Sequence, residues 1–297
     1  MKLALFVDEG TGDWHARRLV KALTARGAEV VTTSLKLCAF DTRTPTGLII
    51  PGFPGALPDG AFVRSISHGS LEQITFRLGI LHALRESGVR VWNDARAIER
   101  CVDKSTATFL FQRAGLPTPM TWTVEGEDPA KSALSLAQLP MVAKPLFGAQ
   151  GVGIVKVDRL EDLPQAVEVG DVYYMQSFIP PRKVDCHEDW RVFVSGGRVL
   201  AAMARRSKSW ITNVAQGAEP SAHEPDAGMR ELAIAATRAL GADYAGVDLI
   251  RHADGQLLVL EVNSNPAWRG LQSVTPVDIA GALADDFIAA LASGAPR

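Results

Sequence analysis

Cysteine is scarce in this sequence, and the cysteines that are present form no pair. There are three, Cys38, Cys101 and Cys186, which are odd in number and widely spaced, without a C-x-x-C motif. Disulfide frameworks and structural zinc sites need paired or closely spaced cysteines. We therefore expect neither, and the cysteine usage is typical of a protein of the reducing cytoplasm.

Long apolar runs and a strong charge of one sign are also absent. No run of about 18 apolar residues occurs, and two acidic residues by position 9 come too early for a signal peptide. The formal net charge of -2 and the pI of about 6.3 give no signal for nucleic acid or an anionic membrane. We expect a cytoplasmic protein whose partners are small molecules, with no nucleic acid and no membrane, and we leave open a homo-oligomer.

What the sequence does contain is enough apolar residues for several domains. Of its 297 residues, 47% are hydrophobic, which is ordinary for a globular protein of two or three domains. The first third alternates short apolar runs with amphipathic segments, a pattern typical of a parallel sheet wrapped by helices. We predict an α/β domain over residues 1–93 and two α+β units over residues 94–180 and 181–297.

The stretch "KPLFGAQGVGIVKV" has Lys144 at the end of a predicted strand and Gly148, Gly151 and Gly153 in the loop that follows. A dinucleotide or P-loop glycine motif must open a helix, whose N-terminus binds the phosphate. Here an alternating strand follows instead. This favours a flexible flap whose backbone N–H groups lie against phosphates, although an ordinary turn is the alternative.

An acidic hairpin is predicted in "DYAGVDLIRHADGQLLVLEVN". A two-residue turn at Asp254-Gly255 would set Asp248 directly opposite Glu261, with Asn263 on the same face. Two carboxylates at that spacing repel unless a cation lies between them, and oxygen ligands of this kind suit Mg²⁺. The alternative is a polar edge of the sheet that faces solvent.

Arginines follow a second predicted hairpin, "DWRVFVSGGRVLAAMARR". Asp189 and Arg191 share one face before a Gly196-Gly197 turn, and Arg205 and Arg206 end the return strand. Paired arginines can clamp phosphate or carboxylate, but an exposed basic strand end without function is equally common.

Two familiar kinds of catalytic site are missing. The six histidines have no metal-ligand spacing, and neither H-E-x-x-H nor G-x-S-x-G occurs. Zinc hydrolysis and nucleophilic triads are therefore disfavoured. Lys104 by itself predicts only a solvated helix residue, but lysines, a glycine flap and an acidic hairpin together fit nucleotide phosphate chemistry.

The order of these motifs resembles the ATP-grasp superfamily, and closely the RimK-type glutamate ligases, from about residue 60 to residue 285. The resemblance rests on "NDARAIERCVDKSTATFLFQRAGLPTP", "VAKPLFGAQGVGIVKV", "YMQSFIP", "DWRVFVSGGRVLAAMARR", "AGVDLIR" and "LEVNSNPAWRGLQSVTPVDIAG". It implies an ATP-grasp fold, α/β and α+β, in which ATP lies between the two later domains. In such enzymes ATP phosphorylates a carboxylate, and an amine attacks the acyl phosphate to form an amide.

The resemblance also implies roles for single residues. The implied Mg²⁺ ligands are Asp248, Glu261 and Asn263, with Mn²⁺ as the alternative ion. We expect Arg191 and one of Arg205 or Arg206 to hold the carboxylate or the acyl phosphate. The implied ATP-binding positions are Lys104, Lys144, Gly148, Gly151, Gly153, Gln176, Ser177, Phe178, Ile179, Asp189 and Asn213.

Departures from the RimK-type pattern concern the substrate more than ATP. Ser177 replaces the hinge glutamate, and Ile211 stands where those ligases have an arginine. The loop "SNPAWRG" after the metal asparagine differs from the small family loop. We therefore expect Asn265, Trp268 and Arg269 to contact the acceptor or glutamate.

The stretch "VRSISHGSLEQITFRLGILHALRESGVRVWN" looks most like the RimK-like ligases that glutamylate tetrahydromethanopterin, a pterin carrier of one-carbon groups. It predicts glutamate and a pterin acceptor as substrates, with the acceptor near residues 52–55 and 65–70. The alternative acceptors are a protein C-terminus, a deazaflavin cofactor and an amino-acid carrier protein. A nucleotide-binding module without catalysis is a different class, which the complete set of lysines and metal positions disfavours. A dinucleotide oxidoreductase would need G-x-G-x-x-G after the first strand, which is missing.

Overall fold

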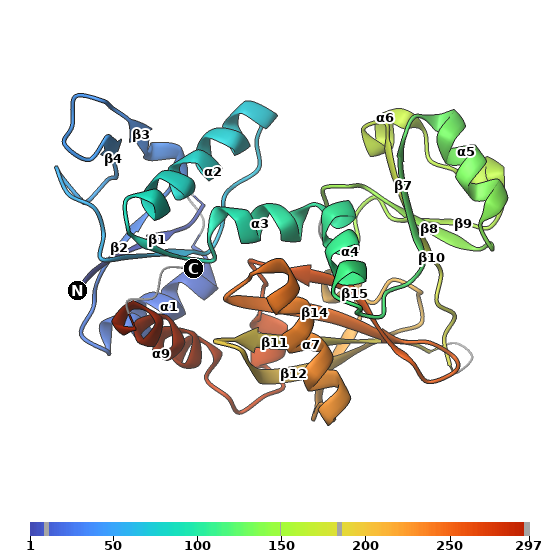
Figure 1. The fold of residues 1–297 in the computed structure, drawn as a ribbon. Coiled ribbons are helices and arrows are strands. Elements are labelled where there is room, and N and C mark those ends of the chain that lie inside the picture. Colours follow the sequence, from blue (N-terminus) through green and yellow to red (C-terminus); the bar gives the residue numbers. More distant parts are fainter. Residues whose placement is uncertain (9–11, 149, 183–185, 294–297) are drawn as a thin grey trace.

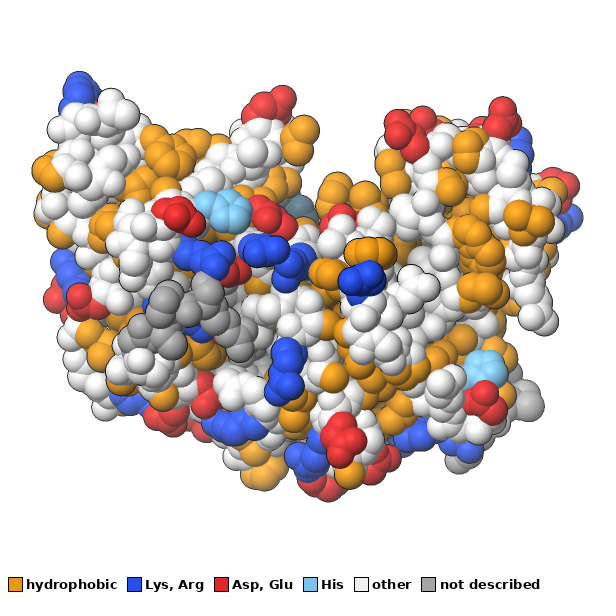
Figure 2. Space-filling model, in the orientation of Figure 1, with side chains coloured by type: hydrophobic (Ala, Val, Ile, Leu, Met, Phe, Trp, Pro, Cys, Tyr) orange, Lys and Arg blue, Asp and Glu red, His pale blue; other side chains and the backbone are white. Residues whose placement is uncertain are grey.

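The structure is a computed structural model that describes residues 1–8, 12–148, 150–182 and 186–293. Three larger sheets follow one another along the chain, and a small two-stranded hairpin, β3 (Ala39–Phe40) with β4 (Leu48–Ile49), precedes the third strand of the first sheet. The molecule has two lobes joined along their lower part, and Figure 2 shows a notch in its surface between the end of α2 (Leu71–Glu86) and the lobe formed by the second sheet.

The first sheet is parallel, as predicted, with the strand order β2-β1-β5-β6. Helices α1 and α9 lie on one side of it and α2 lies on the other (Figure 1). Ser70 and Gln73 form the predicted capping box at the start of α2, and Gly88 follows the end of that helix at φ +85°. The elements are β1 (Lys2–Phe6), α1 (Trp14–Thr24), β2 (Glu29–Thr33), a 3-10 turn η1 (Leu35–Leu37), β5 (Gly60–Val63), β6 (Arg90–Trp92) and α9 (Ile279–Ala292).

The last helix of the chain completes the core of the first sheet. Phe287 of α9 is fully buried and its ring lies 5.5 Å from that of Phe62 in β5. Leu3 and Leu5 of β1 are fully buried in the same cluster. The sequence predicts a closing helix from about Pro276, but not its partner, because that contact joins opposite ends of the chain.

The second sheet is antiparallel with the order β7-β10-β8-β9, and the strands predicted in its sequence are confirmed. The single helix predicted over "LEDLPQAVEV" is wrong, because Pro164 lacks the backbone N–H that a helix interior needs. A 3-10 turn and a four-residue α-helix replace it. The elements are β7 (Thr121–Glu125), α5 (Glu127–Leu136), β8 (Met141–Lys144), β9 (Val155–Val157), η2 (Leu160–Asp162), α6 (Ala166–Val169) and β10 (Val172–Ser177).

The third sheet is antiparallel with the order β13-β12-β11-β14-β15. Gly196 and Gly197, at φ +57° and +78°, form the predicted two-residue turn between β11 and β12. Helix α7 packs on this sheet. The elements are β11 (His187–Ser195), β12 (Arg198–Ser207), η3 (Val214–Gln216), β13 (Glu219–His223), α7 (Ala227–Leu240), β14 (Tyr244–Arg251), β15 (Leu257–Asn263) and α8 (Arg269–Gln272).

Two helices join the first sheet to the other two. The helical stretch predicted over residues 94–114 is divided into α3 (Ala95–Val102) and α4 (Lys104–Arg113), because Asp103 between them caps α4 with its carboxylate. The division of the chain at residues 93 and 180 stays a proposal. In the part of the chain that the structure describes, no helix is both long and apolar enough to cross a membrane.

Candidate functional site

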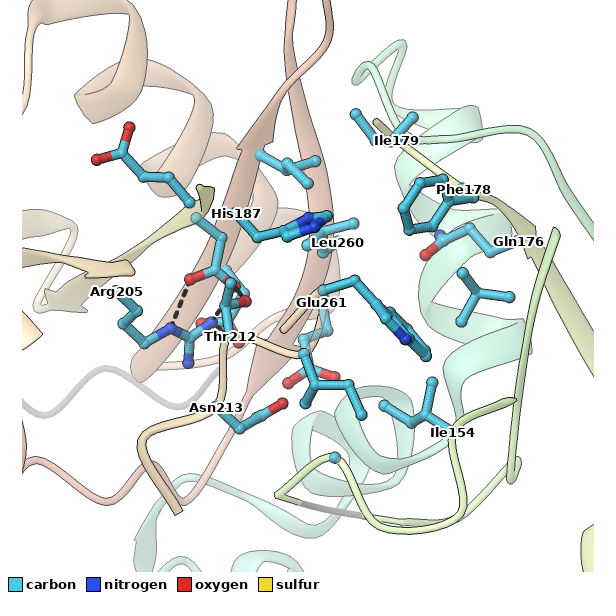
Figure 3. Close-up of a pocket in the computed structure, with 18 of the residues that line it drawn as sticks. Ile154, Gln176, Phe178, Ile179, His187, Arg205, Thr212, Asn213, Leu260 and Glu261 are labelled. Atoms are coloured by element: carbon cyan, nitrogen blue, oxygen red, sulfur yellow. Dashed lines mark hydrogen bonds and ion pairs between the residues drawn. The ribbon is translucent and has the colours of Figure 1, made fainter. Parts of the chain in front are cut away.

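A cavity of about 450 Å³ lies between the second and third sheets, beside the loop that joins β8 to β9, which runs along the lower edge of Figure 3. Most residues predicted for ATP, metal and phosphate binding line it. Those residues are Lys104, Lys144, Gly148, Gly151, Gln176, Ser177, Phe178, Ile179, Asp189, Arg205, Arg206, Asn213, Asp248 and Glu261.

One end of the cavity is apolar. Figure 3 shows Phe178 and Ile179 on the wall that β10 leads into, with Ile154 and Leu260 on other walls. The ring of Trp210, in the loop after β12, lies 6.1 Å from that of Phe178. Flat apolar walls of this kind suit a nucleotide base. Sequence reasoning missed Trp210, which lies in a loop without a recognisable pattern.

The segment after β10 offers few free backbone donors to such a base. The N–H groups of Ser177 and Phe178 donate to the carbonyls of Met120 (2.8 Å) and Pro140 (3.1 Å). Within the described part of the chain, the N–H of Ile179 has no such partner. Residues 176–179 are predicted to contact the base through their backbone, and among them we therefore propose the N–H of Ile179 as the donor.

Lys144 ends β8 and points into the cavity. Its Nζ donates to Oε1 of Gln176 at 2.7 Å and lies 5.9 Å from the centre of the Tyr174 ring. Burial disfavours the ammonium form and lowers the pKa of Lys144 to about 8. An anionic ligand would compensate for that burial, as expected for a lysine that binds phosphate.

Lys104, the first residue of α4, holds the loop between β8 and β9. Its Nζ donates to the carbonyl oxygens of Pro145 (3.1 Å), Leu146 (3.2 Å) and Gly148 (3.2 Å). Burial also lowers its pKa. The lysine read from sequence as a solvated helix residue is therefore a contact between α4 and the glycine-rich loop.

The glycine-rich loop reaches the third sheet. Gly151 has φ +75°, and a Cβ there would lie 2.7 Å from Oδ1 of Asn213. Gly153, at φ +73°, lies against Pro145. Gln216 donates to the carbonyl of Gln150 at 3.3 Å. This loop therefore lines the cavity as the predicted flap would, and Gly151 and Gly153 are needed for positive φ and close approach.

The hairpin of β14 and β15 brings the predicted acidic pair together. Asp248 lies directly opposite Glu261, which confirms the predicted pair. The predicted two-residue turn is wrong: His252 N–H donates to the carbonyl of Gln256 at 2.8 Å, around a loop of residues 253–255. A bulge in β15 next to Val259 then shifts the register by one residue and restores the pair.

The segment after α4 supports that bulge from the outer edge of β15. The N–H of Val259 donates to the carbonyl of Pro117 at 2.8 Å, and its carbonyl accepts from the Thr118 hydroxyl at 2.9 Å. Neither contact can be predicted from the local sequence pattern of two strands and a turn.

Four charged side chains form a buried network beside the hairpin. Arg191 donates to both oxygens of Asp248 at 2.7 Å and lies 3.9 Å from Glu261 Oε1. Arg205 donates to both oxygens of Asp189, at 2.6 and 2.5 Å, and lies 3.0 Å from Asp248 (Figure 3). Burial opposes ionisation of Asp248, but Arg191 and Arg205 outweigh it and hold the pKa of this carboxyl below its usual range.

The hairpin residues fit a magnesium site completed by a substrate. Asp248 is buried, while the Glu261 side chain is 34% exposed towards the cavity. Asn263 donates through Nδ2 to Glu261 Oε1 at 3.0 Å, which leaves its amide oxygen as an acceptor. No group of three or more His, Cys, Asp or Glu that could hold a metal occurs among the described residues. Two carboxylates and an amide suit Mg²⁺, which takes its other oxygens from phosphates and water.

Residues 101–287 match the family model of the RimK-like ATP-grasp domain. The chain belongs to this family. Proteins of the family use ATP and Mg²⁺ to form amide bonds, and the chain is an ADP-forming ligase of this kind.

Individual relatives support the same family. A "Tetrahydromethanopterin:alpha-L-glutamate ligase" of Methanococcus maripaludis is 37% identical, over 77% of this chain and 78% of the relative. One of Methanocaldococcus jannaschii is 36% identical, over 77% and 79%. The solved ATP-grasp ligase PsnB, complexed with a minimal precursor, Mg and ADP, has a TM-score of 0.73 at 20% identity over 98% of both chains. This last likeness shows the ATP-grasp fold alone.

Trp268 of this RimK-like chain does not lie where sequence reasoning put it, and the choice between Arg205 and Arg206 is narrowed. Trp268 is fully buried in the core between the first and third sheets, and we assign it a structural role in place of substrate contact. Arg206 pairs with Glu188 at 2.6 Å on the face of β12 opposite to Arg205, and its side chain is 52% exposed. Of the two candidate arginines, Arg205 is therefore the one beside the hairpin.

The other two predicted substrate residues flank Trp268. Asn265 donates through Nδ2 to the carbonyl of Val63 at 2.8 Å, at the end of β5. Arg269 is exposed at the start of α8 and does not line the cavity. The assignment of both residues to the substrate stays a prediction.

Proposed function

We propose that this RimK-like ligase joins the amine of L-glutamate to a carboxylate of a tetrahydromethanopterin-type pterin. The observation that carries the ligase chemistry is the pair Asp248 and Glu261, which faces Lys104 and Lys144 across one cavity. Support for the substrates comes from the two methanogen relatives, which are named for tetrahydromethanopterin and L-glutamate.

In this proposal the side chains position and neutralise charge. Lys104 and Lys144 bind ATP phosphates, while Phe178, Trp210 and Ile179 enclose the base. Asp248, Glu261 and Asn263 hold Mg²⁺, which supplies positive charge to the phosphates when it is bound. Little covalent chemistry is required of the protein, because in-line phosphoryl transfer depends on orientation and electrostatics.

Two displacements complete the proposed reaction. An oxygen of the acceptor carboxylate attacks the γ-phosphorus of ATP, the bond to the bridging oxygen breaks, and ADP leaves. The uncharged amine of glutamate then attacks the acyl carbon; the amide forms as inorganic phosphate leaves and the amine loses a proton. Arg191, beside Asp248 and Glu261, is the arginine that we assign to the acyl phosphate.

A protein C-terminus, a deazaflavin cofactor or an amino-acid carrier protein as the acceptor would use the same chemistry. The three cysteines are free thiols, which supports the proposed cytoplasmic location.

Mass spectrometry of candidate acceptors incubated with enzyme, ATP and glutamate tests this proposal. We expect one or more glutamyl residues on the pterin and none on peptides, with ADP release that needs both glutamate and the acceptor. Glutamylation of a peptide or carrier protein alone would replace the pterin. Nucleotide binding without turnover for every acceptor would instead support a non-catalytic module.

A further inference from the structure

The loop after the metal asparagine is held by the first sheet. Four hydrogen bonds join residues 264–268 to residues from the first 93 positions of the chain. Asn93 donates to the carbonyl of Ser264 (2.7 Å), and Asn265 donates to that of Val63 (2.8 Å). The other two bonds run from Arg64 Nη1 to the carbonyl of Asn265 (3.0 Å) and from Trp268 N–H to His15 Nε2 (3.2 Å).

Arg64 is the charged centre of this contact. It follows β5 directly, is only 9% exposed, and its Cζ lies 5.3 Å from the centre of the Trp268 ring. Its Nε lies 3.5 Å from Oδ2 of Asp13, the residue that caps α1. The guanidinium thus lies between the N-terminus of α1 and the loop 264–268.

His15 fixes the opposite side of the same contact. Because its Nε2 accepts from the N–H of Trp268, the proton of the neutral ring is on Nδ1 and is donated to Asp13 Oδ1 at 2.8 Å. The 3.4 Å approach of Arg64 Nη2 to His15 Nδ1 then joins two donors and is not a hydrogen bond. The bond that Arg64 makes outside its ion pair is therefore the one to Asn265.

The loop is short and packs against β14, so its position constrains that of Asn263. One residue, Ser264, separates Asn263 from Asn265, so their Cα atoms are about 7 Å apart at most. Gly246 of β14 lies against both Pro266 and Asn263. A Cβ at Gly246 would lie 2.9 Å from Cβ of Pro266, and the Gly246 carbonyl accepts from Asn263 Nδ2 at 3.4 Å. A loop packed this closely on the strand leaves Asn263 little independent freedom.

We propose that Arg64 is a positioning residue for the metal site: through Asn265 it fixes the end of β15, and so the amide of Asn263 beside Glu261. The first sheet then acts in the ligase reaction without touching ATP. The proposal needs the Mg²⁺ assignment of Asn263, but it does not depend on glutamate or a pterin being the substrates.

Binding of Mn²⁺ in the presence of ADP, followed by electron paramagnetic resonance, tests this directly and needs neither substrate. We expect Arg64→Met to weaken Mn²⁺ binding about tenfold, at the low end of the range for residues that orient metal ligands. Arg64→Lys retains one donor for the Asn265 carbonyl and should recover part of the loss. In an Asn263→Ala background, Arg64→Met should add little further weakening, because the group it positions is gone.

Arg26→Met is the matched control. Arg26 also joins distant segments of the first-sheet region, with both oxygens of Asp285 as acceptors at 2.6 and 2.7 Å and the carbonyl of Ala22 at 2.8 Å. It lies outside the contact described above, so Mn²⁺ binding should not change. Unchanged Mn²⁺ binding in Arg64→Met and Arg64→Lys, with only a lower unfolding temperature, would overturn the proposal. The proposal would also be overturned if Arg64→Met weakened Mn²⁺ binding equally in the wild type and in the Asn263→Ala background. If Arg64→Met does not fold, Arg64→Lys alone decides by the same criterion.

Discussion

The ATP cavity and the contact around Arg64 both use charged and amide side chains, but they differ in how far apart in the chain the contacting residues lie. In the cavity, the residues that matter come from short motifs: Lys144 begins the flap, and Asp248 faces Glu261 across one hairpin. Around Arg64, the partners Asp13 and Asn265 come from opposite ends of the chain. The residues assigned to chemistry are thus locally encoded, while those that fix their geometry depend on the tertiary fold.

The largest effect on turnover is expected from Asp248, which is buried beside the cavity. Asp248→Asn should reduce turnover at least about 100-fold, because the metal and Arg191 lose their shared carboxylate. It also leaves Arg191 and Arg205 as buried cations with less compensation, which should cost about 3–5 kcal/mol of unfolding free energy. Initial rates of ADP release and chemical denaturation measure the two effects. An unfolding free energy equal to that of the wild type would mean that Asp248 stabilises Arg191 and Arg205 less than their short distances indicate.

A pH profile separates Lys144 from the other cations. Burial lowers its pKa to about 8, so the group is charged below about pH 8 and becomes neutral as pH rises through that value. The attraction for phosphate is therefore lost on the alkaline side. We expect kcat/KM for ATP, which reports the free enzyme, to fall above about pH 8. Lys144→Arg should lack that fall, since a guanidinium stays charged; identical profiles in both proteins would contradict the assignment.

A smaller effect is expected from the flap. Gly151→Ala places a methyl group at φ +75° and within 2.7 Å of Asn213 Oδ1, so KM for ATP should rise several-fold. Gly170→Ala is the matched control, because Gly170 has φ +65° but nothing within 4 Å of the added Cβ. Equal kinetic effects of the two changes would show that backbone strain, and not the contact with Asn213, is responsible.

The smallest effect is expected from Arg206→Gln. Its side chain is half exposed and pairs with Glu188 at the rim of the cavity. Exposed ion pairs contribute up to about 1 kcal/mol to stability, so the variant should stay folded. Because Arg206 lies on the face of β12 opposite to Arg205, kcat should stay within about threefold of the wild type. A large fall in kcat in steady-state assays would favour Arg206 over Arg205 as the arginine that acts together with Arg191.

The sequence predicted much of the fold, and most of the residues that it assigned to ATP, metal and phosphate line one cavity. Alternation and turn signals identify β14, β15 and the Gly196-Gly197 hairpin, because these contacts join near neighbours in the chain. The turn of the acidic hairpin was predicted wrongly, since the bulge beside Val259 is held by Pro117 and Thr118. Contacts of that kind have no local signal.

The same reason explains what was missed near the first sheet. Trp268 looks like a substrate contact when only its distance from Asn263 along the chain is known. Its ring is fully buried against His15, Arg64 and Phe193, which are far from it in the chain, so the local sequence does not show this burial. Arg64 follows an apolar strand and has no motif, so its contact with Asn265 appears only in the folded chain.

The most direct test of the account is the Mg²⁺ dependence of ADP release in Glu261→Ala. The side chain of Glu261 is partly exposed and, within the described chain, its nearest polar partners are Asn263 and Arg191, so the variant should keep its fold and unfolding temperature. At saturating ATP, amine and acceptor, we expect turnover to fall at least about 100-fold and the remaining rate to need far more Mg²⁺ than the wild type. A variant with wild-type turnover and the same Mg²⁺ dependence would contradict the metal site on the hairpin.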